Sequence, residues 1–275
     1  MYIKTITKPI EKSVRWIVSR TLMLVNKISV RMTNPDDIKS LAKKLYPVSS
    51  DKKLIRLGPK GDGGYLIPND LTGIEACFSP GVSDVSGFEK DCVDLGIKAF
   101  LADKSVSAPS LDHPLFYFTN KFIGARSNDD FITVDSWVEQ SIPDSIKDLL
   151  IQVDIEGYEY ETFLSISDKL MKRFRIIVVE FHNLQQLWNK PYFDLAAPAF
   201  EKILQTHTCV HAHPNNNSDT VTNHGITIPK TIEFTFLRND RISNSSYENI
   251  FPNPLDYDNS PQKPPIPLPK FWYKS

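Results

Sequence analysis

Short apolar runs alternate with stretches of helical periodicity through the middle of the chain. The apolar runs are rich in β-branched and aromatic residues and end in a polar residue or a turn, which predicts β-strands. These strands cover residues 75–78, 98–102, 149–153, 176–181, 208–212 and 231–237, and helices are predicted over 86–95, 157–174 and 194–207. The alternation predicts an α/β fold with a doubly wound, mostly parallel sheet, which binds ligands beyond the carboxyl ends of its strands.

The first fifty residues predict a basic helical extension. Residues 1–33 carry seven basic side chains and one acid, Glu11. Apolar residues recur at helical spacing from Ile10 to Ile28, which predicts an amphipathic helix, but charged residues interrupt every window long enough to span a membrane. A cleaved signal peptide is not expected either. The helix either lies on an anionic membrane surface or packs on its own domain.

The last part of the chain predicts an extended tail over residues 242–275. Seven prolines fall between Pro252 and Pro269. The tail ends in Phe271, Trp272 and Tyr273, and three adjacent aromatic rings are expected to pack on the domain rather than to remain in water. The alternative is that the tail is a Pro-rich ligand for a partner protein.

Composition narrows the function only a little. The 275 residues include 32 Lys and Arg against 33 Asp and Glu, for a net charge of -1, which gives no sign of nucleic-acid binding. The length favours one domain, over residues 51–241, with the two extensions. Cys77, Cys92 and Cys209 are too few for a disulfide framework and too far apart for a thiolate zinc site, so we expect a reducing compartment.

A strand, a turn with Gly81 and a helix form the first candidate ligand site. Gly81 would let the backbone approach a ligand closely. The next strand, about twenty residues later, ends at Asp103, where a carboxylate can accept hydrogen bonds from both hydroxyls of a ribose. The chain lacks Gly-x-Gly-x-x-Gly for a pyrophosphate, so a nucleoside without a diphosphate fits better. S-adenosylmethionine is the commonest such cofactor; an ordinary turn with a helix-capping Asp103 is the alternative.

Acidic residues and histidines follow the ends of three later strands. They are Asp154 and Glu156, then Glu180 and His182, then His211 and His213. Because parallel strands of one sheet end at the same edge, this convergence predicts a catalytic site.

Two schemes for removing the proton of a hydroxyl stay open. In one, His182 accepts the proton, and Glu180 or Asp154 orients the imidazole or stabilises its charged form. In the other, Asp154, Glu180 and His182 hold a hard divalent ion such as Mg²⁺, which lowers the pKa of the hydroxyl. His213 could serve either scheme.

Four segments follow one another along the chain: Lys60-Gly-Asp-Gly-Gly-Tyr-Leu66, Phe78-Ser-Pro-Gly-Val82, Val153-Asp-Ile-Glu-Gly157 and Val179-Glu-Phe-His182. Together they resemble the FkbM-type S-adenosylmethionine-dependent methyltransferases, over roughly residues 54–241. The resemblance implies a seven-stranded Rossmann-like sheet and O-methylation, often of a sugar or a polyketide-linked hydroxyl. It also implies that Asp62 and Gly63 close over the cofactor. The predicted cofactor set is Asp62, Gly63, Ser79, Gly81, Asp84, Asp103, Lys104, Asp154 and Glu156, and Ser79-Pro80-Gly81 departs from the usual glycine-rich loop.

We therefore expect a cytoplasmic O-methyltransferase that acts on a cell-surface or lipid-linked glycan, with peripheral contact on the inner face of the membrane if residues 1–33 bind there. Its partners would be a small-molecule or glycan acceptor and no nucleic acid. The alternatives are a metal-dependent hydrolase that uses the same histidines and carboxylates, and a non-catalytic carbohydrate-binding protein with the same fold.

Overall fold

The computed structural model describes residue 16 and residues 30–82 and 85–274. The basic helix expected before residue 30, apart from residue 16, and the predicted cofactor residue Asp84 therefore lie outside the described residues. Within the described part of the chain, no helix has the length and apolar character needed to cross a bilayer.

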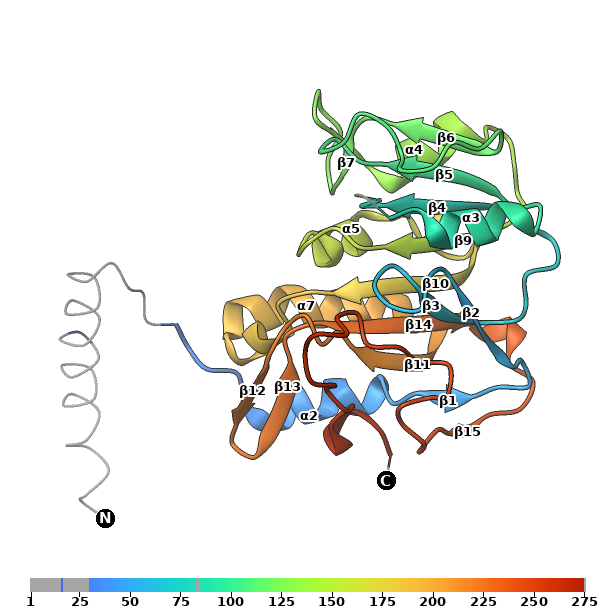
Figure 1. Cartoon of the computed structure of the whole chain (residues 1–275). Coiled ribbons are helices and arrows are strands. Elements are labelled where there is room, and N and C mark those ends of the chain that lie inside the picture. The colour runs from blue at the N-terminus through green and yellow to red at the C-terminus, as the bar shows by residue number, and fades with distance from the viewer. Residues whose placement is uncertain (1–15, 17–29, 83–84, 275) are drawn as a thin grey trace, which may run out of the picture.

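One seven-stranded sheet forms the centre of the molecule (Figure 1). Its strands, in spatial order, are β11 (His207–Pro214), β14 (Ile232–Arg238), β10 (Phe174–Phe181), β9 (Asp148–Val153), β4 (Ile74–Pro80), β5 (Lys98–Ala102) and β6 (Phe116–Thr119). Neighbours from β10 to β6 pair in parallel, whereas β14 pairs antiparallel with both β10 and β11. The prediction of a doubly wound, mostly parallel sheet is confirmed.

Helices and a hairpin cover the two faces. One core cluster joins one face of the sheet to α2 (Pro35–Lys44), α4 (Val134–Ser141), α5 (Glu159–Ser165), α6 (Asp168–Met171) and α7 (Lys190–Leu204). A second cluster joins the other face to α3 (Gly87–Asp94) and to the hairpin of β2 (Leu54–Leu57) and β3 (Tyr65–Pro68). Alternate strand residues such as Ile177 and Val178 enter different clusters, because successive side chains of a strand point to opposite faces.

The helix predicted over residues 157–174 is divided in two. Ile166 is extended after α5, and the Ser167 side chain then accepts a hydrogen bond from the Leu170 amide, which begins α6. Serine favours such a cap because its oxygen satisfies an amide that has no partner inside the helix.

Short elements complete the fold. They are the pairs β1 (Val48–Ser49) with β15 (Ser246–Tyr247), β7 (Phe122–Ile123) with β8 (Phe131–Ile132), and β12 (Thr220–Asn223) with β13 (Ile226–Pro229), and the 3-10 helices η1 (Leu184–Trp188), η2 (Asn239–Arg241) and η3 (Lys270–Trp272).

The Pro-rich tail packs on the domain. Trp272 is only 1% exposed, and its ring lies 6.0 Å from that of Phe234 in the sheet. Its indole nitrogen donates to the Thr227 carbonyl at 3.3 Å. In Figure 1 the tail, coloured red, runs beside β13 and β14 toward the β2–β3 hairpin.

The direction in which successive strands are added to the sheet reverses between β4 and β9, which makes this place a topological switch point. From β4 the sheet grows through β5 to β6, and from β9 it grows in the opposite direction to β10. Gly81 follows β4 at a φ of +86°, and a Cβ there would lie 1.5 Å from the Asp154 carbonyl oxygen, so a side chain at this position is excluded. Ligands of open α/β sheets bind at such switch points.

Candidate active site at the carboxyl ends of the strands

Two cavities lie side by side at the switch point, with volumes of about 480 Å³ and about 260 Å³. Asp62, Gly81 and Asp154 line both cavities, so the two spaces meet there. The larger one is also lined by Ala102, Asp103, Ser105, Phe122, Ile123, Phe131, Ile155, Glu156 and Tyr158, and the smaller one by Gly63, Tyr65, Val82, Val85, Phe88, Glu89 and Gln152. Gly81, Asp103 and Asp154, which the sequence assigned to one ligand site, thus line a single cavity.

Asp103 and Lys104 both follow β5, but their side chains contact different groups. The Asp103 side chain is 6% exposed, and its Oδ1 accepts hydrogen bonds from the amide and the hydroxyl of Ser105, each at 2.7 Å. The ammonium of Lys104 pairs instead with Asp130 and lines neither cavity. Of the two predicted cofactor residues, only Asp103 therefore faces the candidate pocket.

Ser79, a predicted cofactor residue, is buried and lines neither cavity. Its hydroxyl lies within hydrogen-bond reach of Glu89 Oε1, and of Gln152 Oε1 at 2.6 Å. One hydroxyl proton cannot serve both acceptors. A protonated Glu89 satisfies all three groups, because it can donate to Ser79 while Ser79 donates to Gln152. Consistently, burial raises the pKa of Glu89 to about 7.

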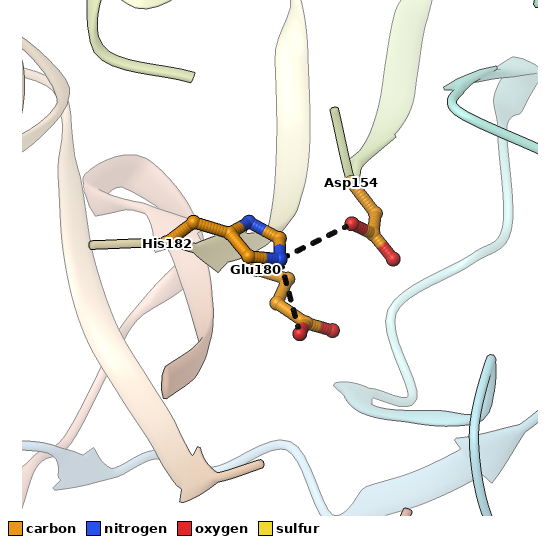
Figure 2. Close-up of side chains that lie close together, drawn as sticks. All are labelled: Asp154, Glu180 and His182. Atoms are coloured by element: carbon orange, nitrogen blue, oxygen red, sulfur yellow. Dashed lines mark ion pairs between the residues drawn. The ribbon is translucent and has the colours of Figure 1, made fainter. Parts of the chain in front are cut away.

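His182 stands at the centre of a carboxylate cluster at the ends of β9 and β10. Its Nε2 lies 3.9 Å from Asp154, 3.6 Å from Glu156 and 3.6 Å from Glu180. Figure 2 shows Asp154 and Glu180 on the same side of the imidazole, with their carboxylates facing a common space. Asp154 connects this cluster to both cavities.

Glu159, in the first turn of α5, orients His182. Its side chain is fully buried, and its Oε1 accepts from His182 Nδ1 at 3.0 Å and from the amides of Gly157 and Ile155 at 2.9 and 3.3 Å. The hydrogen bond on Nδ1 directs the other ring nitrogen toward Asp154. No role was predicted for Glu159 from the sequence, although its position two residues after Gly157 was the available signal.

The electrostatics of the cluster favour a shared proton. Burial raises the pKa of Asp154 to about 7, with Glu156 and Glu159 adding to the effect and His182 opposing it. Burial lowers the pKa of His182, but the hydrogen bond and the charge of Glu159 outweigh it, so the pKa rises to about 9. Such closely coupled groups titrate as a pair.

Glu180 is also buried, with 3% of its surface exposed. Its Oε1 accepts from Asn215 Nδ2 at 2.7 Å, and its Oε2 is buried without a hydrogen-bond partner among the described residues. Burial and then the neighbouring Asp154 raise the pKa of Glu180 well above its usual value. Ligand atoms of Asp154, Glu180 and His182 all lie within 4.8 Å of one another, so these three residues could hold a metal ion.

His211 and His213 do not join the cluster around His182. Because β14 lies between β10 and β11, both histidines turn to the tail residue Asp256, at 2.9 Å from His211 and 3.5 Å from His213. Burial raises the pKa of Asp256, but the two neighbouring histidines outweigh it and hold this pKa well below its usual range. The role in catalysis that we predicted for His213 therefore has no support from proximity.

Asp62 and Gly63 belong to the loop between β2 and β3. Gly63 lines the smaller cavity, and a Cβ there would lie 2.8 Å from the Val85 side chain across it. Asp62 Oδ1 accepts from Asn259 Nδ2 at 3.0 Å. The loop that the resemblance assigned to the cofactor therefore does border the candidate pocket.

A comparison with protein-family models matches residues 81–240 to the methyltransferase FkbM domain, and a search of curated proteins finds no match. The matched region covers more than half of the chain and includes the switch point, Asp103 and the cluster around His182. It agrees with the resemblance seen in the sequence. The chain therefore belongs to the FkbM methyltransferase family.

Proposed function

We propose that the protein transfers the methyl group of S-adenosylmethionine to a hydroxyl oxygen of a sugar in a glycan. The observation that carries this proposal is the pair of cavities that meet at Asp62, Gly81 and Asp154, next to the cluster around His182. One compartment suits a nucleoside, the second suits an amino-acid tail, and the proton acceptors stand at their junction.

The larger cavity fits the adenosine part of the cofactor. Ile123, Phe131 and Ile155 give it apolar walls for a base, and Asp103 offers a carboxylate for ribose hydroxyls. The smaller cavity would then take the methionine part. Within the described residues, both cavities are lined by carboxylates and by no Lys or Arg, which suits the ammonium and sulfonium charges of this cofactor.

Positioning supplies most of the catalysis, because the cofactor brings an already activated methyl group. A bond forms between that methyl carbon and the acceptor oxygen as the bond to sulfur breaks, and the hydroxyl proton must leave. We assign this proton to the pair Asp154–His182, which Glu159 holds in place. Asp154 lines both cavities, so it is the member of the pair that lies at their junction, where the methyl group would be transferred.

A divalent ion is the second version of this mechanism. The observation that favours it is the buried Oε2 of Glu180, which has no hydrogen-bond partner among the described residues. Asp154, Glu180 and His182 would hold the ion, and the contact between Glu159 and His182 Nδ1 is typical of metal-binding histidines. A bound Mg²⁺ or Mn²⁺ would supply a Lewis acid for the acceptor hydroxyl. Binding of Mn²⁺ by the wild type and its loss in Glu180→Gln would support this version; full activity after dialysis against a chelator would refute it.

The glycan acceptor is proposed from the family tendency and from the site. Carboxylates such as Glu156 can accept hydrogen bonds from the hydroxyls of a sugar. The pair Asp154–His182 can take the proton of the hydroxyl that is methylated. The basic residues 1–33 would bring the enzyme to a membrane where lipid-linked saccharides are assembled.

Two measurements test the proposal. Isothermal titration with S-adenosylmethionine should show binding at one site, and the purified protein should transfer a labelled methyl group to a saccharide in an extract of its own host. Mass spectrometry of the labelled product would identify the acceptor. A protein that binds no S-adenosylmethionine, or that labels only non-saccharide molecules, would contradict the cofactor or the acceptor, respectively.

A further inference from the structure

The C-terminal tail is fixed on both sides of residue 259. Before it, Asp256 sits between His211 and His213. After it, the backbone of Ser260 exchanges two hydrogen bonds with the Asn216 side chain, each at 2.8 Å. These contacts fix the path of residues 257–259 at both of its ends.

On this path the tail meets the β2–β3 loop. The Arg56 guanidinium lies 5.1 Å from the centre of the Tyr257 ring and reaches the Leu255 carbonyl at 3.5 Å. The same guanidinium donates to the carbonyls of Pro59 and Gly61 at 2.7 and 2.8 Å. One side chain therefore ties the tail to the loop that carries Asp62.

Asn259 makes the contact that reaches the cavities. It is 7% exposed, and its Nδ2 donates to Asp62 Oδ1 at 3.0 Å and to Glu233 Oε1 at 2.8 Å. The amide therefore donates both of its protons to carboxylates, one in the β2–β3 loop and one in β14. An aspartate in this place could not donate and would add a third negative charge.

We propose that Asn259 is a positioning residue for Asp62, so that the C-terminal tail forms part of the cofactor site. Asp62 lines both cavities and lies in a loop with four glycines between residues 58 and 64, whose backbone has few intrinsic restraints. The amide of Asn259 turns the carboxylate of this loop toward the junction of the cavities and keeps it apart from Glu233. The inference rests on the proposed function, since its effect is expected on S-adenosylmethionine binding.

The test is the affinity for S-adenosylmethionine measured by isothermal titration. Asn259→Asp should weaken binding by about fivefold or more, because it replaces a hydrogen bond to a partly exposed carboxylate by repulsion. Asn253→Asp is the matched control: the Asn253 oxygen accepts from the Leu255 amide at 3.0 Å, which an aspartate oxygen also does, so binding should stay within about twofold. Asn259→Ala, which adds no charge, should fall between the two and replaces Asn259→Asp if that variant does not fold.

A second background separates positioning from a general effect on the fold. In Asp62→Ala, the change Asn259→Asp should cause no further loss of affinity, because the group that it positions is gone. An equal loss in both backgrounds, or unchanged affinity of the Asn259 variants, would overturn the inference while leaving the proposed function intact. A wild-type protein that binds no S-adenosylmethionine would overturn the proposed function, and this role of Asn259 with it.

Discussion

Replacing Glu159 by glutamine tests how the site orients its histidine. Glutamine has nearly the same size, and its oxygen can still accept from the amides of Gly157 and Ile155. The charge that faces His182 Nδ1 at 3.0 Å is lost. Hydrogen bonds to a charged group contribute about 1.5–3 kcal/mol against about 0.5–1.5 kcal/mol for neutral ones. The midpoints of these ranges differ by about 1.2 kcal/mol, which predicts that Glu159→Gln lowers the rate of methyl transfer about eightfold.

Glu161→Gln is the control for this prediction. Glu161 lies in the same first turn of α5 as Glu159, but it is exposed and lines neither cavity, so solvent screens its charge. We expect less than a twofold change in rate. Single-turnover transfer to the acceptor at saturating S-adenosylmethionine measures both variants, with urea unfolding to show that each is folded. Equal effects of the two changes would refute the argument that the buried carboxylate controls His182.

Three other predictions concern the cofactor, stability and the membrane. Asp103→Ala should weaken S-adenosylmethionine binding about tenfold or more in isothermal titration, whereas Lys104→Ala should not, and a comparable loss in both would contradict the ribose assignment. Burial lowers the pKa of His207 to about 4, below the value near 6.5 in the unfolded chain. The stability that neutral His207 contributes is therefore complete above pH 6.5. It is lost as the pH falls toward 4, by about 1.4 kcal/mol per pH unit, because only the unfolded chain takes up a proton in this range. Urea unfolding across this range should show a steeper loss for the wild type than for His207→Gln, and equal slopes would exclude His207 as the cause. Removing residues 1–29 should abolish co-sedimentation with anionic lipid vesicles, and unchanged co-sedimentation would rule out the basic segment as the anchor.

The sequence alone determined the sheet and the edge at which its ligands bind. Short apolar runs that end in a polar residue or a turn favour buried strands over helices, so β9 and β10 were evident from the sequence pattern. Parallel strands end at the same edge of a sheet, so the sequence predicts that Gly81, Asp103 and Asp154 lie close together. In the structure all three line one cavity. The local pattern was sufficient because each of these residues is positioned by the strand that precedes it.

Only the tertiary structure decided which groups of that edge meet. The order of strands is not written in the sequence, and the insertion of β14 between β10 and β11 sends His213 to Asp256 instead of to His182. Likewise, the contact of Asn259 with Asp62 joins residues separated by 197 positions. Such contacts depend on how whole strands and loops pack against one another. That packing is stabilised by many core residues together, so the sequence near Asp62 or near Asn259 does not reveal the contact.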